Sequence, residues 1–358
     1  MTPFPRRRLR GLARRETPPL AHGGSGAGSG LGPRGESAAP AACLELSDAE
    51  AHAAFACGFA VGVVLHTLDS DWSRQQVDGI TATLADYGAE VVEVVDSGFD
   101  ASRQSEEIDR MIQTRPDAII SIPVDETMTA AAHRRIAEAG IALVLMDNVP
   151  RGLRPGVDYV SVVSADSDAA GRIAAELLAP HVAQGAEIGV LGFAAEFFVT
   201  GEREASFRAW FQGNRPDVGL WGARFRDPAD ANAVASELLS AHPAVEGLFV
   251  VWDDPAMAAL AAIRDLGRHV ALTTVDLGMR IALEFAAGTH VKGLAAQQPY
   301  DQGVAEALAA VGALLGKQLP SWVVVPALPV RRETILEDYE RVWHAAPPAE
   351  LVALLNRA

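Results

Sequence analysis

Residues 117–148 read DAIISIPVDETMTAAAHRRIAEAGIALVLMDN, and this stretch decides the fold class. The apolar run at 117–122 ends at Pro123, and a second apolar run at 142–146 ends at Asp147. Residues 126–139 between them are predicted to form a helix. A strand, a helix and a second strand in this order predict a βαβ unit with parallel strands.

The same alternation recurs on both sides of this stretch. Each expected strand is a near-continuous apolar run, which is typical of parallel strands covered by helices on both faces. We expect further strands at 61–65, 90–95, 159–163, 187–192, 219–224, 246–251, 271–275, 291–296 and 322–326, and further helices at 72–87, 102–113, 167–182, 200–213, 230–241, 255–266, 278–288 and 300–316.

The alternation divides the body of the 358-residue chain into two units of similar size. Residues 58–163 supply one doubly wound unit and residues 164–296 supply the next. The sequence therefore predicts an α/β protein with two doubly wound parallel-sheet lobes and a cleft between them.

The charge of the chain is unevenly distributed. The net charge is −16, but residues 1–40 carry seven arginines and two glutamates, so the remainder carries −21. An acidic body repels phosphate backbones, whereas nucleic-acid affinity depends largely on phosphate neutralisation. We therefore expect no nucleic-acid partner and favour a neutral or cationic one.

Residues 1–57 are predicted to be a disordered N-terminal region with a degenerate export segment. The first forty residues are rich in Gly, Pro, Ser and Arg, without apolar periodicity. A basic start and the stretch PAAC at 40–43 resemble an export signal with a lipoprotein cleavage box, which would make Cys43 the lipidated residue. The apolar run between them is missing, so a plain linker cysteine or a misplaced start codon is the alternative.

Polar and aromatic side chains follow the expected strands, where ligands bind in open parallel sheets. Flat aromatic side chains can cover the C–H face of a sugar ring, and carboxylates and amides can pair with vicinal hydroxyls. Acidic residues here can alternatively cap the following helices. The candidate ligand-binding residues are Ser70, Asp71, Trp72, Asp147, Asn148, Phe198, Arg203, Trp252, Asp276 and Gln297.

The sequence gives little support for catalysis. His66, Ser70 and Asp71 share one short loop, which rarely aligns a triad. The nine histidines lack metal-ligand spacing, and the two cysteines, Cys43 and Cys57, cannot form a cysteine zinc site. We therefore predict no catalytic residue, no metal and no cofactor.

Taken together, these stretches resemble the type I periplasmic substrate-binding proteins of sugar ABC transporters, the ribose- and galactose-binding group. The resemblance covers residues 58–345. It is carried by SDWSRQQVDG at 70–79, DAIISIPVD at 117–125, LMDN at 145–148, GEREASF at 201–207, AHPAVEGLF at 241–249, TVD at 274–276 and AQQPYDQG at 296–303.

The resemblance implies roles for particular residues. Trp72 would stack on the sugar, and Asp147, Arg203, Asp276 and Gln297 would bind its hydroxyls. Asn148 stands where ribose binders usually have Arg, and Trp252 where they usually have Asn. The ligand need not be ribose, and a polyol or an amino sugar fits an acidic, aromatic pocket.

The resemblance also implies a mechanism. Three hinge strands, near residues 164–166, 297–299 and 326–329, would join an N-terminal lobe (58–164 plus 298–327) to a C-terminal lobe (165–297 plus 328–358). The lobes would close on a sugar or polyol. The closed monomer, in the periplasm or anchored outside the membrane, would then dock on an ABC transporter permease.

Three alternatives use the same fold. A ligand sensor for a chemoreceptor or kinase would use the same binding lobes. A LacI-type regulator core would need a DNA-binding domain ahead of residue 58. An enzyme would turn over the bound sugar.

Overall fold

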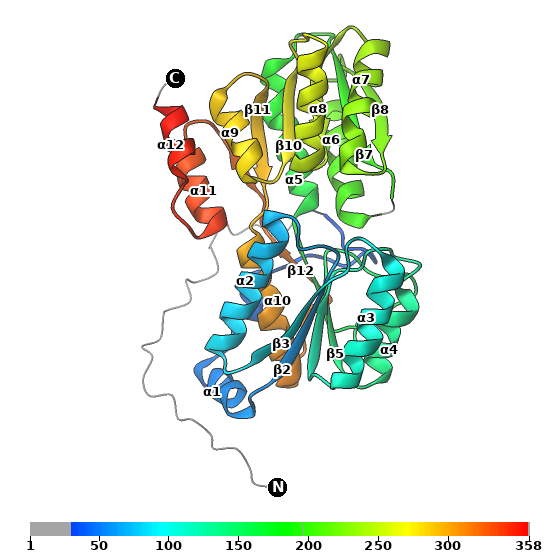
Figure 1. Cartoon of the computed structure of the whole chain (residues 1–358), viewed down its shortest axis with the longest axis vertical. Helices are drawn as coiled ribbons and strands as arrows, with labels where there is room; N and C mark the ends of the chain where they lie inside the picture. Colours follow the sequence, from blue (N-terminus) through cyan, green and yellow to red (C-terminus); the bar gives the residue numbers. More distant parts are fainter. Residues whose placement is uncertain (1–29, 196, 357–358) are drawn as a thin grey trace.

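The computed structural model describes residues 30–195 and 197–356, and two β-sheets form its framework (Figure 1). The first sheet has seven strands in the order β1-β12-β6-β5-β4-β2-β3, and every neighbouring pair is parallel. Its strands are β1 (Ala39–Pro40), β2 (Ala60–Leu65), β3 (Glu90–Asp96), β4 (Ala118–Ser121), β5 (Ala142–Met146), β6 (Ser161–Ala165) and β12 (Trp322–Val325).

The second sheet has six strands in the order β13-β11-β10-β9-β7-β8. All its pairs are parallel except β11 with β13, which is antiparallel. The prediction of an α/β chain with two parallel sheets is confirmed. The strands are β7 (Glu187–Phe193), β8 (Gly219–Phe225), β9 (Val245–Val250), β10 (Ala271–Val275), β11 (Val291–Ala296) and β13 (Leu328–Val330).

Helices follow most strands and pack on the sheets. Within the described ranges, none is both long and apolar enough to cross a membrane. The α-helices are α1 (Asp48–Cys57), α2 (Asp71–Asp86), α3 (Ala101–Thr114), α4 (Ala130–Glu138), α5 (Ser167–Leu178), α6 (Phe198–Asn214), α7 (Ala231–Ala241), α8 (Asp253–Asp265), α9 (Met279–Ala287), α10 (Pro299–Leu314), α11 (Ile335–Trp343) and α12 (Ala349–Leu355).

The two sheets repeat one topology. The order β6-β5-β4-β2-β3 in the first sheet corresponds, strand for strand, to β11-β10-β9-β7-β8 in the second. The chain passes from the first sheet to the second after β6, returns after β11, and passes over again between β12 and β13. Figure 1 shows the two resulting lobes stacked along the long axis of the molecule.

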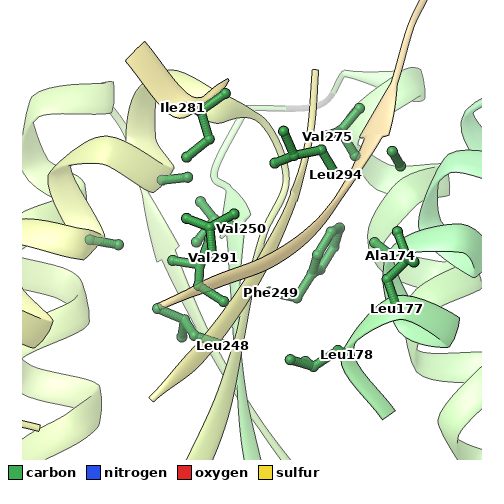
Figure 2. Packing of buried hydrophobic residues seen from close by; sticks show 14 of the residues in the cluster. Ala174, Leu177, Leu178, Leu248, Phe249, Val250, Val275, Ile281, Val291 and Leu294 are labelled. Atoms are coloured by element: carbon green, nitrogen blue, oxygen red, sulfur yellow. The ribbon is translucent and has the colours of Figure 1, made fainter. Parts of the chain in front are cut away.

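Each lobe has its own apolar core. In the second lobe, side chains of β9 alternate between the two faces of the sheet, and Figure 2 shows Phe249 on the face covered by α5. Ala174 and Leu177 come from α5, and Ile281 comes from α9 on the other face. Burial on both faces explains why these strands read as continuous apolar runs.

The prediction that residues 1–57 lack structure is wrong for residues 39–57. Strand β1 pairs with β12, and α1 begins with a capping box in which Ser47 N donates to Glu50 Oε2 over 2.7 Å. The alanine-rich sequence of α1 favours a helix once its first turn is capped. Exposed Cys43 lies in a short 3₁₀ helix, Ala41–Leu44. The part of the prediction that concerns residues 1–29 lies outside the described residues.

The segment after β12 is also more ordered than its sequence suggested. It forms β13, α11 and α12, and the end of α11 contacts both lobes. Trp343 Nε1 donates to Leu277 O of the second lobe over 2.9 Å, and Trp343 O accepts from Gln75 Nε2 of α2 over 2.7 Å. His344 Nε2 lies 3.0 Å from Asp301 Oδ1 in α10. Residues 343–344 therefore connect the lobes at one edge of their boundary.

Candidate functional site

Two aspartates stand directly after corresponding strands of the two sheets. Asp147 follows β5, and its N–H donates to Val163 O of β6 over 2.9 Å. Asp276 follows β10, and its N–H donates to Ala295 O of β11 over 3.0 Å. Both residues have left-handed backbone angles, with φ of 58° and 80° respectively. Such angles are costly for a residue with a Cβ and gather at ligand sites.

A glutamine contacts each aspartate. Gln302 Nε2, from α10, donates to Asp147 Oδ1 over 3.4 Å. Gln297 Nε2, directly after β11, donates to Asp276 Oδ1 over 2.6 Å. These contacts fix one oxygen of each carboxylate.

Arg203 of α6 brings the two aspartates into one electrostatic group. Its side chain is 4% exposed, and Nη1 donates to Val251 O over 3.1 Å. The positive charge acts to lower the pKa of both Asp147 and Asp276. Arg203 therefore lies close to carboxylates contributed by both lobes.

Burial nevertheless has the largest effect on the pKa values of these acids. It raises the pKa of Asp147 to about 7 and also raises the pKa of Asp276. A third acid, Glu306 of α10, is fully buried, and burial together with the charge of Asp147 raises its pKa well above the usual range. Gln76 Nε2 of α2 donates to Glu306 Oε1 over 3.2 Å. This region therefore holds more acids than cations.

Asn148 makes a second link between the lobes. Its Oδ1 accepts from Phe198 N, the first residue of α6, over 3.0 Å. The Phe198 ring meets Trp322 of β12 edge-on, with centroids 6.4 Å apart. The predicted residues Asn148 and Phe198 thus lie together at the lobe boundary.

Several buried polar atoms here have no hydrogen-bond partner among the described residues. Such atoms are rare in folded proteins and call for an explanation. Donors and acceptors both occur, as a ligand with several hydroxyl groups requires. The atoms are Asn148 Nδ2, Arg203 Nε, Gln297 Oε1 and Gln302 Oε1.

The polar cluster at the lobe boundary consists of Asp147, Asn148, Arg203, Asp276, Gln297 and Gln302. A cavity of about 250 Å³ adjoins this cluster. Ser70, Asp71 and Trp72 line it from the start of α2, and Asp276 and Gln297 line it from the second sheet. Ser70 also caps α2, because its Oγ accepts from Ser73 N over 3.1 Å. Five of the ten predicted ligand-binding residues therefore share one cavity.

Trp252 lies in a different environment. Its ring meets Phe193 and Phe225 edge-on, with centroids 5.2 and 5.1 Å apart. It packs in this aromatic cluster at the carboxyl ends of β7 and β8, and it is not part of the cavity wall.

His66, Ser70 and Asp71, the three loop residues considered as a triad, each contact a partner outside this set. His66 packs edge-on against Trp72 and Phe99, and burial lowers its pKa to about 4. Asp71 pairs with Arg74, and Ser70 with Ser73. Each of these three side chains thus contributes to local packing or capping.

Sequence reasoning missed three residues of this region, Gln302, Glu306 and Trp343, and it found Asp253 only as a residue that follows an expected strand. Gln302 stands in a stretch that carried the resemblance, one turn beyond the proline that starts α10. Glu306 had a readable signal, since it is the only acid in the apolar run VAEALAAV at 304–311. Trp343 gave none, because the fold of the tail brings it to the cavity.

Comparison with known proteins places these observations in a family. The periplasmic binding protein domain matches residues 61–318. The ribose import binding protein of Bacillus subtilis is 26% identical over 268 residues, which is 75% of this chain and 86% of that protein. The D-ribose/D-allose-binding protein of Pseudomonas aeruginosa is 27% identical over 215 residues, 58% of this chain and 67% of that protein.

Solved structures agree on the fold. An ABC transporter solute-binding protein of Agrobacterium vitis, with bound alpha-D-tagatopyranose, superimposes with a TM-score of 0.72 at 18% identity, over 81% of this chain and all of that one. Another from the same organism, with bound allitol, gives 0.69 at 22% identity, over 79% and 98%. From the matched domain and the two-lobed topology, we conclude that this chain belongs to the periplasmic binding protein family.

Proposed function

We propose that this chain is a solute receptor that captures a monosaccharide or a polyol between its lobes. One observation carries the proposal: Asp147 and Asp276, one from each lobe, converge near the buried Arg203. Relatives of this chain are named for ribose and allose, and solved structures of the same fold hold a hexose or a sugar alcohol. The proposed role is binding and delivery, without a chemical step.

The polar groups of the cluster suit a polyhydroxyl ligand. Carboxylates of Asp147 and Asp276 would accept hydrogen bonds from hydroxyls, and Arg203 would donate to hydroxyl oxygens. Asn148, Gln297 and Gln302 would supply further donors and acceptors. Each of these side chains already has one contact that fixes its orientation, so little freedom would be lost on binding.

Aromatic groups would cover the apolar faces of the ligand. Trp72 at the start of α2 would stack on the ring, and Phe198 would border the ligand from the other lobe. Ser70 and Asp71 would lie at the rim. Trp252 would affect ligand binding indirectly, by packing with Phe193 and Phe225 in an aromatic cluster.

Closure would follow from contacts on both sides of the ligand. We propose that residues 58–164 with 298–327, joined by β1 and α1, move as one lobe, and that 165–297 with 328–358 move as the other. The three crossover segments would be the hinges. A ligand that touches both lobes stabilises the closed state only when it is bound.

The names of relatives, such as the ribose import binding protein, support a membrane transporter as the partner. We propose that the closed, monomeric form docks on an ABC transporter permease and acts outside the cytoplasmic membrane. We also propose exposed Cys43 as a candidate for a lipid anchor, in which case cleavage before it would remove β1 from the mature lobe.

A binding screen tests the proposal. Thermal unfolding would be recorded with pentoses, hexoses, sugar alcohols and amino sugars, followed by calorimetry on any compound that raises Tm. Asp147→Ala and Arg203→Ala are expected to weaken binding by about 2–5 kcal/mol, roughly 30-fold or more. Asp265→Ala and Arg264→Ala, at exposed positions in the last turn of α8, serve as matched controls. A panel with no binder would refute the proposal, and so would site variants that bind as tightly as the controls.

A further inference from the structure

The cavity next to the polar cluster has an excess of negatively charged side chains. Five carboxylates line it, and two guanidinium groups oppose them. The guanidinium groups belong to Arg74 and Arg280, and the carboxylates belong to Asp69, Asp71, Asp253, Asp254 and Asp276.

The two arginines act mainly on two of these acids. Arg74 pairs with Asp71 at the exposed rim. The charge of Arg280 acts to lower the pKa of Asp254, against the effect of burial. Both acids also stand in the first turns of helices, where negative charge is favourable without any ligand. The arginines and the positive ends of the helix dipoles thus account for Asp71 and Asp254.

Asp253 shares the first turn of α8 with Asp254, but it is also tied to another segment of the chain. Its Oδ2 accepts from Gly278 N over 3.0 Å, which ties the start of α8 to the residue before α9 and fixes the carboxylate beside the cavity. Burial and the negative charges of Asp276 and Asp254 raise its pKa well above the usual range. Asp253 therefore lies beside two other carboxylates on the wall of one cavity, and a bound cation would favour the ionised form of these acids.

Gln297 supplies an independent observation. The side chain is 3% exposed and lines the same cavity. Its Nε2 donates to Asp276 Oδ1 over 2.6 Å, which identifies Oε1 as the free end of the amide. Oε1 is buried and has no hydrogen-bond partner among the described residues. Neither Gln297 nor Asp276 is part of a helix, so capping does not explain them.

Two indole rings complete the walls. Trp72 lines the cavity from the first lobe, and Trp343 lines it from the C-terminal segment. Indole faces attract cations more strongly than other aromatic side chains do. Acceptor oxygens on Asp253, Asp276 and Gln297, with aromatic walls nearby, match a group that has positive charge and three N–H donors.

We propose that this cavity binds a primary ammonium group, so that the ligand of this chain is an amino sugar or an amino polyol. The inference rests on the proposed function, because the rest of the ligand would occupy the cluster around Asp147 and Arg203. Asp253 and Gln297 are the residues assigned to the ammonium group.

Calorimetry on the wild-type chain with matched pairs of compounds tests this inference. D-Glucosamine and D-galactosamine would be compared with D-glucose and D-galactose, and 1-amino-1-deoxy-D-sorbitol with D-sorbitol, at pH 6.5. At least one amino compound is expected to bind tenfold or more tightly than its neutral partner. N-Acetyl-D-glucosamine and N-acetyl-D-galactosamine, which have neutral amides, are expected to lose this advantage.

The Asp253→Asn variant tests whether this cavity causes the preference for amino compounds. Asparagine can still accept from Gly278 N through its amide oxygen, so the fold is expected to survive, and thermal unfolding would check this. The variant should lose most of the preference for the amino compound, measured as the ratio of the Kd of the neutral compound to the Kd of its amino partner. Asp265→Asn, on the same helix but away from the cavity, should keep the preference.

The outcomes separate the two proposals. If neutral compounds bind at least as tightly as all their amino partners, the ammonium inference is overturned and the receptor function stands. If neither kind binds, both proposals fail. If the preference exists but survives in Asp253→Asn, the assignment to this cavity is wrong.

Discussion

Asp147 and Asp276 occupy corresponding positions in the two halves of the molecule and share a left-handed backbone. Each follows the second of five matching strands, β5 in one sheet and β10 in the other, and each accepts a hydrogen bond from a glutamine. The repeated topology thus places one strained acid in each lobe, on either side of the same boundary.

The left-handed backbone at Asp147 predicts that two variants at this position differ in stability. Asp147→Gly and Asp147→Ala both remove the carboxylate, but only glycine adopts φ of 58° without steric cost. The glycine variant is expected to be more stable than the alanine variant by about 1 kcal/mol. Urea unfolding of the two proteins without ligand measures this. An alanine variant of equal or greater stability would contradict the strain at this position.

Buried Glu306 predicts a pH dependence of stability. Its pKa is higher in the folded chain than in the unfolded chain, so the folded chain holds the proton more tightly. The resulting stabilisation is complete below about pH 4.5 and is lost as pH rises through the higher, folded pKa. Asp147, with its pKa raised to about 7, contributes in the same direction.

Glu306→Gln tests this pH dependence. Glutamine resembles the protonated acid, so the variant should have nearly the wild-type Tm at pH 5 and a higher Tm than wild type at pH 8. Thermal unfolding at both pH values measures it, with Glu237→Gln at an exposed site of α7 as the matched control. A variant that is less stable than wild type at pH 8 would show that ionised Glu306 is stabilising.

Close packing of α2 on α10 predicts the effect of two glycine substitutions. A Cβ at Gly79 would collide with Tyr300 O, and a Cβ at Gly303 with Gln76 O, both backbone atoms that cannot swing away. Gly79→Ala and Gly303→Ala should each destabilise the chain by about 1–3 kcal/mol. Gly213→Ala in α6, which meets open space, should be neutral or stabilising by up to about 1 kcal/mol. Urea unfolding compares the three.

Trp343 predicts a contribution of the C-terminal segment to stability. In Trp343→Phe, the indole N–H that donates to Leu277 O is lost and the ring becomes smaller. The expected loss is about 1–3 kcal/mol, seen as a lower Tm. Trp221→Phe, at an indole that is 42% exposed on β8, should change stability by less than about 0.5 kcal/mol. Equal effects of the two substitutions would argue against a bridging role for Trp343.

The strands could be predicted because burial on both faces leaves a strong signal in the sequence. The expected ranges 142–146, 271–275 and 291–296 coincide with β5, β10 and β11. One helix start was predicted less well than the others. The helix expected at 126–139 begins at Ala130, because the Asp125 carboxylate accepts from Thr127 N and Met128 N and forms a turn first.

The candidate site was predictable only in part. Asp147 and Asp276 could be identified because strand ends of parallel sheets share one edge. Gln302 and Glu306 reach the site through the packing of α10, and Asp253 through a contact with the loop before α9. Such side-chain relationships depend on how helices sit on the sheets, which local patterns in the sequence do not encode.

Two of the six tryptophans, Trp72 and Trp343, line the same cavity from different lobes. Indole fluorescence depends on the polarity and quenching groups around the ring, and carboxylates and guanidinium groups line the same cavity here. Closing or filling the cavity would therefore change the emission of the unlabelled chain. The molecule carries its own optical reporter, and stopped-flow mixing could use it to time lobe closure.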